Sequence, residues 1–183
     1  MIEPTRRMVL AAAMGVGMAA DKEMLAWDFG FPSIDEGRLE FAAFRGQVLL
    51  VTNTASFCGY TYQYEGLEKL DKVASPRGLT VIGVPSQDFN QESADNKTVK
   101  TFCEVTFGVE FPMAGIVHVR GPEAAPFYAW VRMQKSWEPN WNFNKVLIGR
   151  DGRVAGMFGS GDEPAGPKLS QAIATELGKT ASP

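Results

Sequence analysis

The stretch from residue 48 to residue 70, VLLVTNTASFCGYTYQYEGLEKL, joins two different hydrophobic patterns. Residues 48–53 begin with four consecutive apolar side chains, as expected of a strand that is buried on both faces. From residue 62 to about residue 75, apolar side chains recur at helical spacing, and Gly78 is expected to close that unit. The pattern predicts a buried strand followed by a helix, with Cys58 between them.

Apolar residues outside this stretch also alternate between strand-like and helical spacing. Short apolar runs predict strands, and stripes at intervals of three to four residues predict helices. The pair Asp151–Gly152 is a strong signal for a two-residue hairpin turn. The expected strands are residues 79–85, 116–119, 146–148 and 154–158, with an amino-terminal hairpin of residues 25–29 and 38–41; the expected helices are residues 95–107, residues 124–133 and a last one that turns Leu169, Ala172, Ile173 and Leu177 inward.

The order of these elements indicates a fold class. Strand, helix, strand and helix, followed by a strand hairpin and a final helix, is the order of the thioredoxin fold. Parallel strands come first and the antiparallel pair comes near the end. We therefore expect an α/β protein with a central mixed sheet flanked by helices and an extra amino-terminal β-hairpin. No internal repeat interrupts residues 21–183, which indicates one domain.

The first twenty residues differ in composition from the rest of the chain. A basic start, MIEPTRR, precedes the thirteen-residue apolar run MVLAAAMGVGMAA, and charge resumes at Asp21. This is the layout of a secretory signal peptide, and the run is too short to span a bilayer. The paired arginines also admit the twin-arginine route; a disordered tail or a short first helix is the alternative. We expect cleavage of residues 1–20 after Ala19 or Ala20 and a periplasmic protein without a membrane anchor.

Bulk composition argues against several classes of function. The chain has 183 residues, 45% of them hydrophobic, which is enough for one domain with a real core. A formal net charge of −3 and the lack of a basic run argue against a nucleic-acid partner. With one His and two Cys, no metal-ligand spacing is present, so neither a metal nor another cofactor is expected.

Cys58 is a candidate nucleophile because it precedes a predicted helix. A helix amino terminus offers unpaired N–H groups and the positive end of the helix dipole, and both favour a thiolate over a thiol. Gly59 beside it lets other groups approach closely. The alternative is a small buried hydrophobic residue, which is what most free cysteines are. No CxxC motif is present, so a dithiol oxidoreductase of the thioredoxin type is not expected.

Four segments, in order, resemble the motifs of the glutathione peroxidase family. Residues 48–70 are similar to the signature around the family's catalytic cysteine or selenocysteine. Three further segments resemble the motifs that follow it: VIGVPSQDFNQE (residues 81–92), FCEVTFGVEFPM (residues 102–113) and WNFNKVLIGRDGRV (residues 141–154). The resemblance covers most of the chain, from about residue 29 to residue 158. It implies a thioredoxin-fold enzyme that reduces hydroperoxides with the Cys58 thiolate.

In this family Gln, Trp and Asn side chains surround the catalytic cysteine. Cys58, Trp141 and Asn142 occupy matching positions. The indole N–H and the amide NH₂ would donate hydrogen bonds to the thiolate and to the departing hydroxide, stabilising charge where it develops. Without the resemblance, Trp141 would be taken for a core aromatic residue and Asn142 for a turn or cap residue.

The position of the family's glutamine departs from the pattern. It holds Asp88, with Gln87 just before it and one residue missing before Gln91. An ionised carboxylate beside a thiolate would be repelled by it. Asp88 must therefore be protonated and donating, be turned away from the cysteine, or be replaced in its role by Gln87.

Cys103 matches the position of the resolving cysteine in those non-selenium members that recycle through an internal disulfide. In that chemistry a sulfenic acid on Cys58 condenses with the second thiol, and an external dithiol reduces the product. Two alternatives remain open. Cys103 lies on the apolar stripe of its helix and could be a core residue, or the two cysteines could form a permanent structural disulfide.

The resemblance also implies partners. Only twelve residues separate Tyr128 from Trp141, where tetrameric animal members carry a long insertion. The chain is thus similar to the short, monomeric type, which generally prefers thioredoxin-like reductants to glutathione. The predicted function is reduction of hydrogen peroxide and organic hydroperoxides. The alternatives are a peroxide-sensing redox relay that passes a disulfide to a partner, and a noncatalytic binding module. His118, the single histidine, is expected to be structural.

Overall fold

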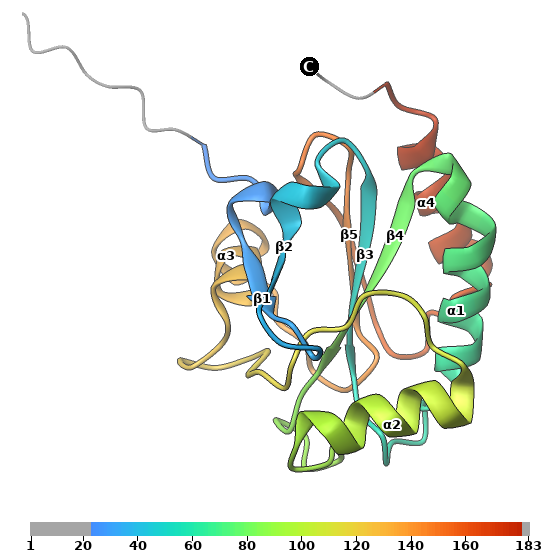
Figure 1. The fold of residues 1–183 in the computed structure, drawn as a ribbon. Coiled ribbons are helices and arrows are strands. Elements are labelled where there is room, and N and C mark those ends of the chain that lie inside the picture. The colour runs from blue at the N-terminus through green and yellow to red at the C-terminus, as the bar shows by residue number, and fades with distance from the viewer. Residues whose placement is uncertain (1–22, 181–183) are drawn as a thin grey trace, which may run out of the picture.

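The computed structural model describes residues 23–180, which fold around a four-stranded mixed sheet (Figure 1). Its strands, together with those of a small amino-terminal hairpin, are β1 (Gly30–Pro32), β2 (Arg38–Glu40), β3 (Val48–Thr54), β4 (Leu79–Pro85), β5 (Lys145–Ile148) and β6 (Val154–Phe158). The order in the main sheet is β4-β3-β5-β6. β3 pairs parallel with β4, whereas β5 pairs antiparallel with β3 and β6. β1 and β2 form a separate antiparallel pair.

Helices cover both faces of the main sheet. They are α1 (Gln63–Ala74), α2 (Asn96–Phe107), α3 (Pro126–Lys135) and α4 (Pro167–Leu177), with short 3₁₀ turns η1 (Ala26–Asp28), η2 (Phe41–Phe44) and η3 (Ser75–Arg77). In Figure 1, α1 and α4 lie on one side of the sheet and α3 lies on the other, beside the amino-terminal hairpin. α2 crosses below the sheet in that view. The expected thioredoxin fold with an added hairpin is confirmed.

Every residue of β3 is buried because its alternating side chains enter two apolar clusters. Val48 and Leu50 pack in a cluster with Leu67 of α1. Leu49 and Val51 point the other way, into a cluster that includes side chains of α3. Burial on both faces explains the continuous apolar run in the sequence. The predicted strand at residues 48–53 and the helix that follows it are therefore confirmed as β3 and α1.

The predicted helix at residues 95–107 is α2, and its ends have recognisable causes. The Asp95 side chain accepts a hydrogen bond from the Thr98 backbone N–H at 2.9 Å and caps the amino terminus. Gly108 ends the helix in the left-handed region, with φ of 63°. Pro126 and Pro167 open α3 and α4 at the position where a missing N–H costs no hydrogen bond.

The first strand of the amino-terminal hairpin lies later in the chain than predicted, whereas the second lies within the predicted residues 38–41. Its first strand is Gly30–Pro32, and residues 25–29 contain the turn η1 in place of a strand. The turn forms because the Asp28 side chain accepts from the Leu25 N–H at 2.9 Å, while Ala26 and Trp27 are buried in the core. Apolar side chains in this segment therefore anchor a turn to the core and do not line a strand.

The strand predicted at residues 116–119 is absent from the described fold. The backbone N–H groups here find acceptors outside a ladder: Ile116 donates to the Asn96 side chain, Val117 to the Pro85 carbonyl, and Val119 to the Asp88 side chain. Nearby, only single β-bridges form, Ser33 with Ala114 and Gly83 with Met113. Two side-chain acceptors and one isolated backbone carbonyl thus replace strand pairing in this segment.

The β5–β6 hairpin is confirmed, but its turn is longer than the two residues expected. The Gly149 N–H donates to the Arg153 carbonyl at 2.9 Å, so Arg150, Asp151 and Gly152 form the turn. The predicted signal peptide and its cleavage site lie outside residues 23–180 and are not described. Within those residues, no helix is long and apolar enough to cross a bilayer.

Candidate active site

Cys58 lies in the loop that joins β3 to α1, five residues before the helix begins. Its N–H donates to the Thr61 hydroxyl at 3.0 Å, and that hydroxyl donates to the Ala55 carbonyl at 2.9 Å. The Tyr60 N–H is directed at the Cys58 sulfur, 3.4 Å away. The residue is 9% exposed, so the sulfur is nearly buried with a backbone donor beside it. Such a donor stabilises negative charge on sulfur.

Trp141 and Asn142 are brought to the end of β3 by hydrogen bonds to Asn53. The Asn53 side-chain amide donates to the Trp141 carbonyl at 2.9 Å, and the Phe143 N–H donates to the Asn53 carbonyl at 2.6 Å. Phe143 has a φ of 58°, which is unusual for a side chain of this size. Strained backbone of this kind persists only where surrounding structure enforces it.

The side chains of Trp141 and Asn142 have very different environments. The Trp141 ring is 41% exposed and packs against the Phe89 ring at 5.4 Å between centroids. The Asn142 side chain is fully buried, and its Nδ2 donates to Oε1 of Gln91 at 2.9 Å. Its Oδ1 is buried without a hydrogen-bond partner among the described residues.

Gln91 is a member of this group that the sequence analysis did not select. Besides accepting from Asn142, Gln91 accepts a hydrogen bond from the Phe57 N–H at its backbone oxygen, at 2.9 Å. It therefore joins the Cys58 loop to Asn142. The signal that pointed to it was the missing residue before Gln91, which shifts this glutamine relative to the family motif.

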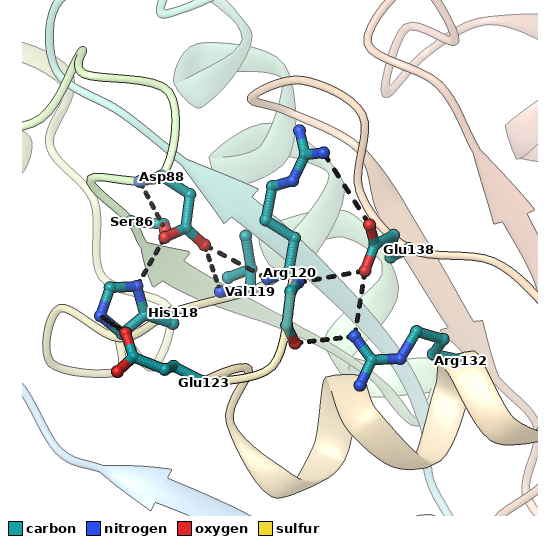
Figure 2. Close-up of polar contacts among 9 residues, drawn as sticks. Ser86, Asp88, His118, Val119, Arg120, Glu123, Arg132 and Glu138 are labelled. Atoms are coloured by element: carbon teal, nitrogen blue, oxygen red, sulfur yellow. Dashed lines mark hydrogen bonds and ion pairs between the residues drawn. The ribbon is translucent and has the colours of Figure 1, made fainter.

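Asp88 is turned toward the segment of residues 118–120, as Figure 2 shows. Its Oδ2 accepts from the backbone N–H groups of Val119 and Arg120, at 2.6 and 3.2 Å. Its Oδ1 lies 2.6 Å from Nδ1 of His118. This hydrogen bond raises the pKa of His118. Of the three roles considered for Asp88, the geometry favours the one in which the carboxylate is turned away.

Gln87 is exposed, and its amide donates to the Ser93 carbonyl at 2.7 Å. Both side chains therefore have other partners: Gln87 bonds within its own loop, and Asp88 bonds to residues 118–120. The Asn142 carboxamide bonds to neither of them, since its partner is Gln91.

Cys103 lies on the inner face of α2, in the same apolar cluster as Cys58. It is fully buried, and burial raises the pKa of its thiol to about 11, against a smaller lowering by the Tyr64 hydroxyl. Both cysteines are free, so this structure is the dithiol form. Of the residues of α2, all of which are described, Val99 and Cys103 are the buried ones.

A buried polar network of Lys145, Gln63 and Ser160 bonds to the backbone of Phe143 and Asn142. It was not predicted from the sequence. The Lys145 ammonium donates to Oε1 of Gln63 at 2.7 Å and to the Phe143 carbonyl at 2.8 Å. The Gln63 amide donates to the Ser160 carbonyl at 2.6 Å, and the Ser160 hydroxyl donates to the Asn142 carbonyl at 2.6 Å. Desolvation lowers the pKa of Lys145 to about 8. The sequence signal for this network was a lysine at the start of the otherwise apolar strand β5.

Neither a metal cluster among the described residues nor the cleft beside α2 belongs to the Cys58 site. No group of three His, Cys, Asp or Glu side chains in residues 23–180 is arranged to hold a metal ion. A cleft of about 450 Å³ lies between the amino-terminal hairpin and α2. Its walls carry Lys100, which pairs with Asp35 and Glu104, so the charges there satisfy one another. Its lining includes none of the residues around Cys58.

Comparison with known proteins finds one family. The sequence profile described as Glutathione peroxidase matches residues 26–132, a span that includes Cys58, Asp88 and Cys103 and ends before Trp141. A glutathione peroxidase of Lactococcus lactis subsp. cremoris is 37% identical over 143 residues, covering 75% of this chain and 91% of that protein.

Further relatives carry more specific names. The hydroperoxy fatty acid reductase gpx1 of Synechocystis is 35% identical over 158 residues, covering 80% of this chain and 94% of that protein. The thioredoxin/glutathione peroxidase BtuE of Escherichia coli is 36% identical over 162 residues, covering 74% of this chain and 88% of that protein. The crystal structure of Trgpx in apo form superposes with a TM-score of 0.70 at 30% identity, over 87% of this chain and all of that one. The chain therefore belongs to the glutathione peroxidase family.

Proposed function

We propose that this protein is a thiol-dependent peroxidase in which the Cys58 thiolate reduces hydrogen peroxide and organic hydroperoxides. The observation that carries the proposal is the environment of the Cys58 sulfur. It is nearly buried with the Tyr60 N–H directed at it, and Gln91 ties its loop to the Asn142 amide. The names of the relatives support peroxide reduction over a redox relay, since each is named as a peroxidase or a hydroperoxide reductase.

In the first step the Cys58 thiolate attacks an oxygen of the hydroperoxide. A sulfur–oxygen bond forms and the oxygen–oxygen bond breaks, so the cysteine becomes a sulfenic acid. The leaving oxygen takes up a proton and departs as water or as an alcohol. Hydrogen-bond donors at the site stabilise the charge that moves from sulfur to the leaving oxygen. Trp141 and Asn142 are proposed as side-chain donors, in addition to the Tyr60 N–H.

In the second step the Cys103 thiolate attacks the sulfenic sulfur. A disulfide forms, the sulfur–oxygen bond breaks, and the oxygen leaves as water after protonation. A thioredoxin-like dithiol or glutathione then reduces the disulfide, in keeping with the name of the Escherichia coli relative. Burial holds Cys103 as a thiol, with a pKa of about 11, so the residue must be exposed to become a nucleophile.

α2 is the element that must open for this resolution step. Two of its side chains, Val99 and Cys103, are buried, whereas α1 buries five. Phe102 and Phe107 of α2 are partly buried against the cluster that holds both cysteines, so unwinding exposes a limited set of apolar side chains. Local opening of such an element costs less than global unfolding. The proposal is that α2 unwinds at least partly, brings Cys103 to Cys58 and refolds after reduction.

Aromatic side chains around the Cys58 loop suit organic hydroperoxides. Phe57 is 67% exposed beside the cysteine, and Tyr62 and Trp141 are also exposed. Such a rim offers apolar contact area for a substrate tail or for a protein reductant. We further propose that the enzyme acts as a monomer in the periplasm after removal of residues 1–20.

The test measures peroxide consumption coupled to thioredoxin and, separately, to glutathione. Wild type should turn over many times, which a stoichiometric relay would not do. Cys58→Ser should abolish consumption while the far-ultraviolet spectrum stays unchanged, because serine is close in size and can accept the same hydrogen bonds. Cys103→Ser should still oxidise once at Cys58, but sulfenic acid should accumulate and thioredoxin-driven turnover should collapse. Retained turnover in folded Cys58→Ser would refute the proposal.

A further inference from the structure

We infer that Gln91 is the positioning residue that holds the Asn142 amide for peroxide reduction at Cys58. The inference rests on the proposed role of Cys58 and adds a residue to that site. The family pattern has a glutamine at position 88, where this chain has an aspartate, and Gln91 is the side chain that contacts the Asn142 amide.

Two hydrogen bonds place Gln91 between the two halves of the site. Its backbone oxygen accepts from the Phe57 N–H at 2.9 Å, one residue before Cys58. Its side-chain oxygen accepts from Nδ2 of Asn142 at 2.9 Å, across 51 positions of sequence. Among the described residues, Gln91 is the only side chain that bonds to the Asn142 carboxamide. A buried amide without a hydrogen-bond partner is destabilised by desolvation. The hydrogen bond to Gln91 therefore fixes the orientation of the Asn142 amide.

A glutamine at position 91 suits the chemistry of the amide pair. In the present arrangement Asn142 donates to Gln91, and Oδ1 of Asn142 has no partner. If both amides rotate by half a turn, the Gln91 NH₂ donates to that oxygen and both N–H groups of Asn142 become free. Gln91 can therefore hold Asn142 in either orientation, because an amide both donates and accepts. A carboxylate can only accept, and an apolar side chain can do neither.

The two nearer candidates are occupied elsewhere. Asp88 accepts hydrogen bonds from the Val119 and Arg120 N–H groups and contacts His118 (Figure 2). Gln87 is exposed and donates to the Ser93 carbonyl. The missing residue before Gln91 shortens this loop, and the side chain that reaches Asn142 comes from position 91.

The experiment measures the second-order rate constant for oxidation of Cys58 by hydrogen peroxide in a single turnover of the reduced enzyme. Gln91→Met should slow this step roughly tenfold to a hundredfold, less than the 10²–10³ typical of losing a donor itself. Gln87→Met is the matched control and should leave the rate constant unchanged. The fraction of Cys58 present as thiolate, measured by ultraviolet absorbance, should be recorded for each variant.

Two further readouts separate positioning from a general structural role. Gln91→Glu should keep most of the wild-type rate constant, because a carboxyl oxygen can accept from Nδ2 of Asn142 as the Gln91 oxygen does. In an Asn142→Ala background, Gln91→Met should have little additional effect, because the two residues act as one unit.

Three outcomes would overturn the inference. They are a wild-type rate constant in Gln91→Met, an equal loss in Gln87→Met, or an undiminished effect of Gln91→Met in Asn142→Ala. If Gln91→Met does not fold, Gln91→Ala decides, and a wild-type rate constant in that variant would count against the inference. If Cys58→Ser keeps reducing peroxide, the proposed function itself fails. A Cys58-dependent enzyme that is indifferent to Gln91 would contradict the positioning role alone.

Discussion

Oδ1 of Asp88 lies 2.6 Å from Nδ1 of His118, so a nearly buried carboxylate holds a half-exposed imidazole ring (Figure 2). The other carboxylate oxygen accepts from two consecutive backbone N–H groups, those of Val119 and Arg120. The aspartate at the family's glutamine position is therefore an anchor for residues 118–120. Its hydrogen-bond partners belong to that segment, whereas the Asn142 amide donates to Gln91.

Asp88→Ala should destabilise the fold more than it slows oxidation of Cys58. The Val119 and Arg120 N–H groups would lose their acceptor, which typically costs about 1–3 kcal/mol of unfolding free energy. Asp88→Asn keeps one acceptor oxygen and should lose less. Urea denaturation and single-turnover kinetics measure the two effects, with the exposed Glu123→Ala as a control. A stable Asp88→Ala that oxidises far more slowly would instead place Asp88 in the catalytic group.

His118 should titrate above its usual range because the Asp88 carboxylate accepts its Nδ1 proton and raises its pKa. The chain has a single histidine, so one set of imidazole NMR signals reports it without ambiguity. In Asp88→Asn the pKa should return toward about 6.5, the ordinary value. Glu123, 3.7 Å from Nε2, remains in that variant and is a smaller influence. An unmoved titration would contradict the pairing.

The same pair gives stability a pH dependence of defined sign. A histidine whose pKa is raised in the folded state contributes stability that is complete below about pH 6.5, the unfolded value. The contribution is lost as pH rises through the folded-state pKa. Because the ring is half exposed, the effect should stay within about 1 kcal/mol. The difference in unfolding free energy between wild type and His118→Gln should therefore shrink as pH rises; a constant difference would argue for packing alone.

The lowered pKa of Lys145 should make the unfolding free energy rise with pH, opposite to the effect of His118. Its pKa is lowered to about 8, so the folded protein releases this proton before the unfolded chain does. The cost of burying the ammonium is complete below pH 8 and is relieved as pH rises toward about 10.5, on the order of 3 kcal/mol in total. Lys145→Met should remove this rise from the pH dependence of unfolding free energy. Parallel curves for wild type and variant would show that the buried lysine does not titrate in this range.

Cys103 should be almost unreactive until α2 opens. In Cys58→Ser, which leaves one thiol, alkylation at neutral pH should be roughly 10²-fold slower than for an exposed cysteine, because a pKa of about 11 leaves little thiolate. Asp95→Ala removes the cap of α2 and should accelerate alkylation about fivefold, since a cap contributes about 1 kcal/mol. Lys179→Ala, beyond the end of α4, should leave the rate unchanged. Rapid alkylation in the capped protein would mean that Cys103 is accessible without opening.

The export proposal is tested on protein from the native host. Mature chain should begin at Ala20 or Asp21, with the corresponding loss of mass, and should be found in the periplasm. Intact amino-terminal sequence in the cytoplasm would overturn both the localisation and the cleavage site.

The sequence by itself determined the elements whose side chains repeat with a clear period. β3 and β4 were predictable because they are buried on both faces, and α1 because its apolar stripe faces one cluster. The same pattern failed at residues 25–29 and 116–119, where apolar side chains are anchored without a strand ladder. The motif around Cys58 identified the candidate nucleophile, since its residue types lie close together in the chain.

Only the tertiary structure decided which of the surrounding side chains form hydrogen bonds with one another. Asp88 pairs with His118 across 30 positions, Gln91 with Asn142 across 51, and Lys145 with Gln63 across 82. A side-chain hydrogen bond depends on the direction in which each loop leaves its strand, and one deleted residue changes that direction. Local sequence therefore predicted which residue types gather near Cys58, whereas the path of the backbone selected Gln91 over Asp88 and Gln87 as the partner of Asn142.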